Sequence, residues 1–180
     1  CPYKKVYFNP ITRVSEKCIG CYPAVEGGRQ SQCTVTCIGK IRLNGFITTP
    51  DRADEHNPMD YLVHVAKVAL PLYPQFGLEP NVYYIPPIHV PPPYLIQMFG
   101  HGVPQAIETY KRARDDKRLL GALMLFGSTP EILHRFRVIG DHAIGYDEKG
   151  GEVVRVPLTE PFQIRAFFDE ARKVYRHNVT

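Results

Sequence analysis

Four cysteines crowded between positions 18 and 37 constrain this chain more than any other feature. The segment reads CIGCYPAVEGGRQSQCTVTC, so two residues separate Cys18 from Cys21, and after an eleven-residue spacer three residues separate Cys33 from Cys37. A C-x2-C pair places two thiolates on one tight turn, where both can bind the same iron or zinc ion. The later pair can complete that site or bind at a second one. The segment therefore predicts a metal centre.

The fifth cysteine, Cys1, is followed directly by Pro2. In two-cluster ferredoxins the last cysteine of a run, within Cys-Pro, ligates the other cluster. Cys1-Pro2 is therefore typical of the end of a run that begins upstream, and we interpret the sequence as a fragment or a processed piece. On spacing alone, an iron–sulfur cluster and a four-cysteine structural zinc site are nearly equal alternatives. The Cys-Pro pair favours iron–sulfur.

Composition narrows the class of protein. At 180 residues and 44% hydrophobic content the chain can bury a core, while 17 prolines and 14 glycines indicate many loops. The net charge of +4 comes from interspersed acids and bases, which argues against a nucleic-acid partner. No apolar run approaches the roughly 18 residues of a membrane helix, so we expect no direct membrane span. An odd number of clustered cysteines argues against a secreted disulfide framework.

The segments around the cysteines predict short strands and loops. Residues 4–8 and 14–17 are β-prone and flank a turn at 9–12, which predicts a hairpin. The spacer at 22–32 is polar and contains a Gly-Gly pair, so we expect an exposed loop rather than a helix. Residues 38–49 alternate loosely between apolar and polar and contain an Asn-Gly pair at 44–45, which predicts a second hairpin.

A helix is expected next. Asn57 followed by Pro58 is typical of a helix start, and the pattern continues over 58–70, with Pro71 ending it. His56 and His64 have no second ligand at a useful spacing, so we interpret them as surface or packed residues rather than metal ligands. The predicted apolar face of the helix consists of Leu62, Val65, Ala66 and Ala69.

The stretch 71–102 contains eight prolines, which exclude a long helix or a central strand. Its aromatic and aliphatic residues are too apolar for a solvated linker. We interpret it as an ordered arm laid over a partner protein; the alternative is a loop packed on the domain's own core. The predicted contact residues are Tyr83, Tyr84, Ile85, Tyr94, Leu95, Met98 and Phe99.

The remainder predicts helices and short strands. Helices are expected over 104–114 and 116–126, the second with an apolar face and ended by Gly127. A Ser-Thr-Pro-Glu sequence at 128–131 has capping-box spacing and predicts another short helix. The other expected elements are strands at 137–144 and 152–157 and a helix in the latter half of 162–175.

Motifs for hydrolytic, phosphoryl-transfer or dinucleotide chemistry are absent from the sequence, and its carboxylates are scattered. No catalytic residue and no substrate pocket are therefore expected. If the protein takes part in catalysis, it does so by moving electrons.

Two regions of the sequence resemble a known protein family. The pattern CPYKKVYFN…SEKCIGCYP…CIGKIR resembles the iron–sulfur (beta) subunits of respiratory molybdenum oxidoreductases related to nitrate reductase, within the dimethyl sulfoxide reductase superfamily. The stretches VALPLYPQFGLEPNVYYIPP and HVPPPYLIQMFG resemble more narrowly the beta subunits of the selenate, chlorate, dimethylsulfide and ethylbenzene enzymes and of some nitrite oxidoreductases.

The resemblance implies an α+β fold in three parts. These are the C-terminal part of a ferredoxin-like 4Fe-4S domain at 1–50, a helix with the proline-rich interface arm at 51–102, and a loop-rich, helical and short-strand region at 103–180. The family subunit carries three [4Fe-4S] clusters and one [3Fe-4S] cluster. It relays electrons between a molybdopterin catalytic subunit and a haem b subunit in anaerobic respiration.

Carried over by position, Cys18, Cys21 and Cys33 resemble three ligands of one [4Fe-4S] cluster whose fourth ligand lies upstream. Cys37 resembles a ligand of a second [4Fe-4S] cluster and Cys1 of a third. The other cysteine runs of the family are not in this sequence, so it holds no complete cluster. The proline-rich stretch resembles the periplasmic members, so we expect a periplasmic location; the alternative is the cytoplasmic face of the membrane.

Overall fold

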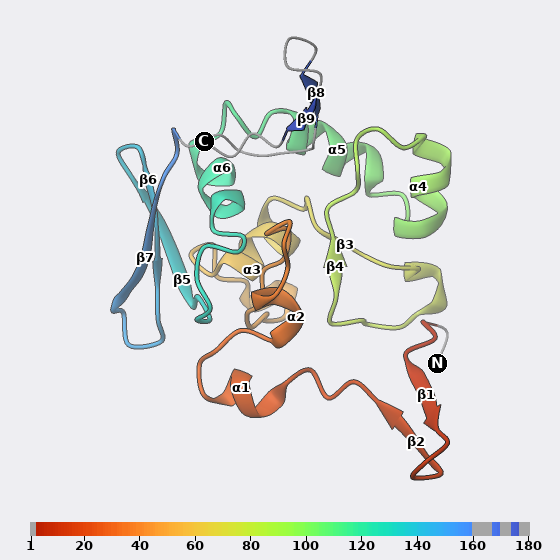
Figure 1. The fold of residues 1–180 in the computed structure, drawn as a ribbon. Helices are drawn as coiled ribbons and strands as arrows, with labels where there is room; N and C mark the ends of the chain where they lie inside the picture. Colours follow the sequence, from red (N-terminus) through yellow and green to blue (C-terminus); the bar gives the residue numbers. More distant parts are fainter. Residues whose placement is uncertain (1–2, 160–166, 170–173, 177–180) are drawn as a thin grey trace.

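A computed structural model describes residues 3–159, 167–169 and 174–176, in a mixed α+β fold (Figure 1). The predicted class is thereby confirmed, with the helices and strands interleaved along the chain. Its elements are β1 Val6–Asn9, β2 Val14–Lys17, α1 Tyr22–Glu26, α2 Gln32–Val35, η1 Pro50–Arg52, α3 Pro58–Asp60, η2 Tyr61–Val65, β3 Leu70–Pro71, η3 Pro74–Phe76, β4 Tyr83–Tyr84, α4 Pro92–Phe99, α5 Val103–Lys111, α6 Lys117–Met124, β5 Arg135–Ile139, β6 His142–Tyr146, β7 Glu152–Pro157, β8 Phe167–Asp169 and β9 Val174–Arg176.

The predicted N-terminal hairpin is confirmed. Strands β1 and β2 pair antiparallel from Val6 opposite Lys17 to Asn9 opposite Val14. The Asn9 side chain accepts hydrogen bonds from the Ile11 and Thr12 amides at 3.0 and 3.3 Å, which closes the turn. Figure 1 shows the hairpin extending away from the body of the molecule, and the chain then runs from β2 to α1.

The main core lies between α6 and the antiparallel sheet β5–β6–β7 (Figure 1). Asp116 caps α6 as its carboxylate accepts from two amides of the first turn, and the apolar face expected for this helix is buried at Leu119 and Leu123. A Cβ atom at Gly121 would lie 2.5 Å from Val138 Cγ2. Glycine therefore lets the helix approach the sheet more closely than any other residue would allow.

The single strand expected at 137–144 is instead a hairpin. Strands β5 and β6 meet at a turn around Gly140, which has a left-handed φ of 61°. Strand β7 coincides with the strand predicted at 152–157. The helix expected in the latter half of 162–175 is wrong where it can be compared, because β8 and β9 form an antiparallel pair; the rest of that stretch lies outside the described residues.

The proline-rich stretch forms a second core, with α5, which confirms the helix predicted at 104–114. Helix α4 begins with prolines in its first turn, where a backbone N–H group would have no intrahelical acceptor, so proline's lack of an N–H is tolerated. Leu95 and Phe99 are only 1% and 7% exposed and pack against Val103. Their prediction as partner contacts is therefore wrong. The list of predicted contacts is otherwise divided: Tyr83 and Ile85 pack on the main core, Met98 packs on the second core, and Tyr84 and Tyr94 are exposed.

The helix predicted at 58–70 begins as expected and then changes to wider π-helical turns. The Asn57 side chain accepts from the Met59 amide at 2.9 Å. Over η2 the helix has π geometry, with the Ala66 amide donating to the Tyr61 carbonyl at 2.7 Å. It ends at Ala66, before Lys67, whose φ is 52°. The wider turn rotates Val65 away from the core, so that it is 46% exposed.

Three other local predictions are wrong. No strand lies within 38–49, because Asn44 accepts a hydrogen bond from the Ser31 amide and neither Asn44 nor Gly45 is among the described residues with positive φ. The stretch 128–131 forms no helix, because Glu131 pairs with Arg29 in an antiparallel bridge. The spacer at 22–32 begins with the short helix α1. Within the described ranges, no helix is long and apolar enough to cross a membrane.

Candidate metal centre

Four of the five predicted ligands lie in the described part of the chain. Cys18 and Cys21 flank the turn between β2 and α1, Cys33 lies in α2, and Cys37 follows that helix. All four are free thiols; Cys18 and Cys33 are exposed, and the other two are half-buried. Cys1 lies outside the described residues.

The first cysteine pair sits on the predicted tight turn. Gly20 and Cys21 both have left-handed φ values, 68° and 55°. The turn directs the Gly20 amide at Cys18 Sγ, with N and S 3.4 Å apart. The Cys21 carbonyl then accepts from the Ala24 and Val25 amides and starts α1. Amides that donate to sulfur are one of the features that tune iron–sulfur centres.

The second pair is surrounded by hydrogen-bond donors and one cation. The Ser31 hydroxyl lies 3.4 Å from Cys33 Sγ, and its hydrogen bond lowers the pKa of Cys33. Partial burial opposes this shift, and the Arg42 guanidinium reinforces it. The backbone N–H of Ile41, helped by those of residues 39 and 40 and by Arg42, lowers the pKa of Cys37. Both shifts favour the thiolate, the form that binds metals.

The donor chemistry fits an iron–sulfur cluster, because soft free thiols are accompanied by N–H groups aimed at sulfur. Whether these thiols converge on one metal site is a separate question. Among the residues that the structure describes, no three Cys, His, Asp or Glu side chains gather where they could hold one metal ion. The assignment of Cys18, Cys21 and Cys33 to one cluster and of Cys37 to another stays a prediction. His64 is engaged elsewhere, with Nε2 2.9 Å from the Thr48 carbonyl oxygen.

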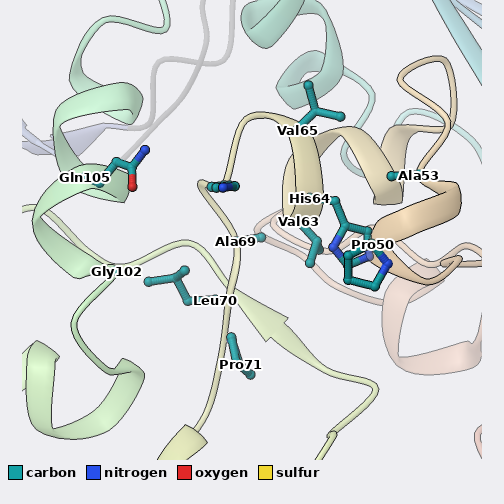
Figure 2. Close-up of a pocket in the computed structure, with 11 residues that line it drawn as sticks. Pro50, Ala53, Val63, His64, Val65, Ala69, Leu70, Pro71, Gly102 and Gln105 are labelled. Atoms are coloured by element: carbon teal, nitrogen blue, oxygen red, sulfur yellow. The ribbon is translucent and has the colours of Figure 1, made fainter.

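A shallow groove of about 550 Å³ lies away from the thiols (Figure 2). It runs between the η1–η2 region, where His64 and Pro50 lie, and the start of α5, where Gln105 lies. No cysteine lines it.

Sequence reasoning identified the thiols and missed the groups around them. Ser31 and Arg42 carry no motif, and the amides of residues 39–41 have no side-chain signal at all. A serine two residues before Cys33 and an arginine five residues after Cys37 are the only traces in the sequence. Their roles depend on how the loop after α2 folds back, which spacing does not reveal.

Known proteins match this chain in two ways. Residues 1–46 match a family described as a 4Fe-4S dicluster domain. The dimethylsulfide dehydrogenase subunit beta of Rhodovulum sulfidophilum is 41% identical over 133 residues, which cover 66% of this chain and 39% of that protein. The selenate reductase subunit beta of Thauera selenatis is 44% identical over 126 residues, covering 61% of this chain and 37% of that protein.

A more distant relative extends the match. The respiratory nitrate reductase subunit beta of Haloferax mediterranei is 37% identical over 160 residues, which cover 75% of this chain and 44% of that protein. The chain thus spans about two fifths of the length of these relatives.

Proposed function

This chain belongs to the iron–sulfur beta subunits of the respiratory molybdenum oxidoreductases related to nitrate reductase, and we propose that it serves as an electron-transfer subunit without an active site of its own. The observation that carries the proposal is the match of residues 1–46 to a 4Fe-4S dicluster domain, together with four free cysteines in that same segment. Iron–sulfur clusters, when bound, accept and pass on electrons.

The proposed ligand set divides the cysteines among clusters. Cys18, Cys21 and Cys33 would bind one [4Fe-4S] cluster, and Cys37 and Cys1 would each bind a different one. The full-length subunit would hold three [4Fe-4S] clusters and one [3Fe-4S] cluster in a ferredoxin-like arrangement, and the division of this chain at residues 50 and 102 belongs to the same proposal.

Replacing each cysteine by serine in the full-length subunit tests the assignment. Each of the first three substitutions should disturb one and the same EPR signal, while the other two should each disturb another. Loss of a single common signal in all five variants would refute the division.

A four-cysteine zinc module is the competing function, and the C-x2-C…C-x3-C spacing favours it. Metal analysis, labile-sulfide assay, visible absorption and EPR on anaerobically purified full-length protein separate the two. We expect iron and sulfide in similar amounts and a brown protein. A colourless protein with one zinc ion and no sulfide would end the electron-transfer proposal.

The proposed partners are a molybdopterin-containing catalytic subunit and a haem b subunit. Because Leu95 and Phe99 are buried within this chain, the proposed contact surface consists of the residues of the arm that are exposed to solvent. Glu79 is the one Asp, Glu, Lys or Arg in the sequence 71–102, and depletion of charge with enrichment of aromatic residues is typical of interface cores. The exposed apolar residues of the arm are Phe76, Leu78, Val82, Tyr84, Ile88 and Tyr94.

A double substitution, Tyr84→Ala with Tyr94→Ala, tests this surface. It should weaken co-purification with the catalytic subunit and leave the cluster spectra of the subunit unchanged. Tyr7→Ala is the matched control, because Tyr7 on β1 is 57% exposed and Tyr94 is 58% exposed. Wild-type association of the double variant would place the interface elsewhere.

For location we propose the periplasm, with the cytoplasmic face of the membrane as the alternative. The support is the resemblance of the proline-rich stretch to the periplasmic members of the family. In that group the catalytic partner carries the twin-arginine export signal. Identifying and sequencing the gene of the catalytic partner decides the question, since a partner without that signal would favour the cytoplasmic face.

A further inference from the structure

Residues 127–132, in the connection between α6 and β5, are hydrogen-bonded to the cysteine segment around Gln30. The Gln30 amide donates to the Pro130 carbonyl at 2.7 Å, and its side-chain Nε2 donates to the carbonyls of Thr129 and Glu131 at 3.2 and 3.0 Å. Gln30 therefore bonds to three successive carbonyls although it is only 3% exposed. The Ile132 amide returns a bond to the Gly28 carbonyl at 2.8 Å. Four hydrogen bonds thus fasten the spacer between Cys21 and Cys33.

The connection is itself held firmly. Ile132 and the adjacent Leu133 are 2% and 1% exposed, and Leu133 belongs to the main core. The Ser128 hydroxyl donates to the Leu125 carbonyl at 2.8 Å, and the Glu131 amide donates to Thr129 Oγ1 at 3.1 Å. The three carbonyls that Gln30 uses therefore belong to a segment anchored to the main core rather than to a free loop.

Gln30 is linked to Cys33 through its neighbour Ser31, which is hydrogen-bonded to Asn44 and Thr34. The Ser31 amide donates to Asn44 Oδ1 at 3.2 Å, and the Ser31 hydroxyl lies 3.1 Å from Thr34 Oγ1 and 3.4 Å from Cys33 Sγ. Ser31 and Thr34 are 7% and 6% exposed, whereas Cys33 is exposed. Helix α2 thus has a buried, polar base and presents its thiol outward.

The same connection touches the chain near Cys37. A Cβ atom at Gly127 would lie 2.7 Å from Lys40 Cβ and Cδ and 3.0 Å from Lys40 Cα, so the two backbones are in close contact. The Lys40 amide donates to the Cys37 carbonyl at 3.1 Å. The one connection therefore contacts the chain three residues before Cys33, at Gln30, and three residues after Cys37, at Lys40.

We propose that Gln30 is a positioning residue that fixes Cys33 relative to Cys37 by fastening the base of α2 to the 127–132 connection. This inference depends on the proposed electron-transfer function, because its consequence is for the centres that these two thiols would bind. Ligand geometry and hydrogen bonds to sulfur set the potential of such centres. The C-terminal region would then tune redox properties without supplying a ligand.

The test uses three variants of the full-length subunit in its complex. Gln30→Ala removes both side-chain bonds, and Gln30→Glu removes the same two donors at nearly unchanged size. Gln32→Ala is the matched control, since Gln32 is exposed and its side chain makes no hydrogen bond within the described residues. The readouts are hydrogen exchange of the 28–36 and 128–133 segments, EPR line shape, and cluster midpoint potentials.

Gln30→Ala should exchange about tenfold faster in both segments, as expected for the loss of two buried hydrogen bonds, and Gln30→Glu at least as fast, because its buried carboxylate would face the Thr129 and Glu131 carbonyls without a donor. They should also alter the EPR line shape and shift the midpoint potential of the centres that Cys33 and Cys37 serve, while Gln32→Ala behaves as wild type. If Gln30→Ala does not accumulate, Gln30→Asn, whose shortened amide cannot reach both carbonyls, is read in the same way.

Faster exchange with unchanged line shape and potentials would overturn the positioning role and leave the electron-transfer proposal standing. A wild-type protein without iron and sulfide would instead refute the electron-transfer proposal before any variant is compared. The two failures are therefore distinguishable.

Discussion

Substituting Asp60 tests how the 48–54 turn, which follows the cysteine segment, is attached to the helix that contains η2. Its side chain is fully buried, at 0% exposure, and accepts three hydrogen bonds from the 48–54 turn. Oδ1 accepts from the Thr48 amide at 2.8 Å, while Oδ2 accepts from Thr48 Oγ1 at 2.8 Å and from the Asp54 amide at 3.0 Å. The perturbation is Asp60→Asn, which preserves size and replaces one acceptor oxygen by an NH₂ group.

Neither orientation of the new amide satisfies the site. If its oxygen faces the Thr48 amide, its NH₂ meets the Asp54 N–H; if it is flipped, its NH₂ meets the Thr48 N–H. The Thr48 hydroxyl can turn and accept, but a backbone N–H cannot. One buried donor without an acceptor costs about 1–3 kcal/mol, and replacing charge-assisted bonds by neutral ones adds about 1 kcal/mol. We therefore expect the turn to lose about 2–4 kcal/mol.

Hydrogen exchange of the 48–57 segment measures this loss directly, since about 2 kcal/mol corresponds to roughly thirtyfold faster exchange through local opening. Asp51→Asn is the control in the same turn, because the Asp51 side chain is 75% exposed and lies 3.8 Å from Arg52, a pair of little energetic value. Equal exchange in the two variants would refute the conclusion that Asp60 holds the turn to η2.

Three further predictions concern stability of the full-length subunit in thermal unfolding. Gly121→Ala should destabilise, because overpacking against Val138 at about 1–3 kcal/mol outweighs a helix-propensity gain of about 1 kcal/mol, and Val138→Ala should relieve part of the loss. Lys67→Gly should stabilise by about 0.5–1 kcal/mol, because glycine tolerates the φ of 52°, whereas Lys67→Ala should not. The Lys117 ammonium, 2.7 Å from Asp141, lowers the pKa of the Asp141 carboxyl. The small contribution of this ion pair to the stability of the fold is therefore fully present above the ordinary pKa of the carboxyl and is lost as the pH falls through the lowered pKa. Lys117→Met should accordingly lower the unfolding temperature only above that pH range.

Local signals in the sequence predicted elements whose ends are determined by adjacent residues. Asn57 caps its helix and the Asn9 turn closes its hairpin because both use side-chain contacts within a few residues. Asp116 acts in the same way at the start of α6. The thiols themselves were equally accessible to sequence reasoning, since their spacing is a local property.

The failures involve long-range contacts. Asn44 would favour a hairpin turn, but its side chain binds Ser31 instead. Glu131 has capping-box spacing from Ser128, yet its backbone pairs with Arg29 across the fold. Burial of Leu95 in this chain's own core could not be distinguished from burial in an interface by apolarity alone, because both remove the side chain from water.

The distance along the chain between Gln30 and its acceptors has a consequence for synthesis. Its side-chain bonds span 99 and 101 residues of sequence. At about 5–20 residues per second, the ribosome needs roughly 5–20 s to make the intervening chain. During that interval the base of α2 has no carbonyls to bind, so Cys33 and Cys37 emerge on an unfastened loop. Any factor that loads metal during translation would meet these thiols before their final spacing exists.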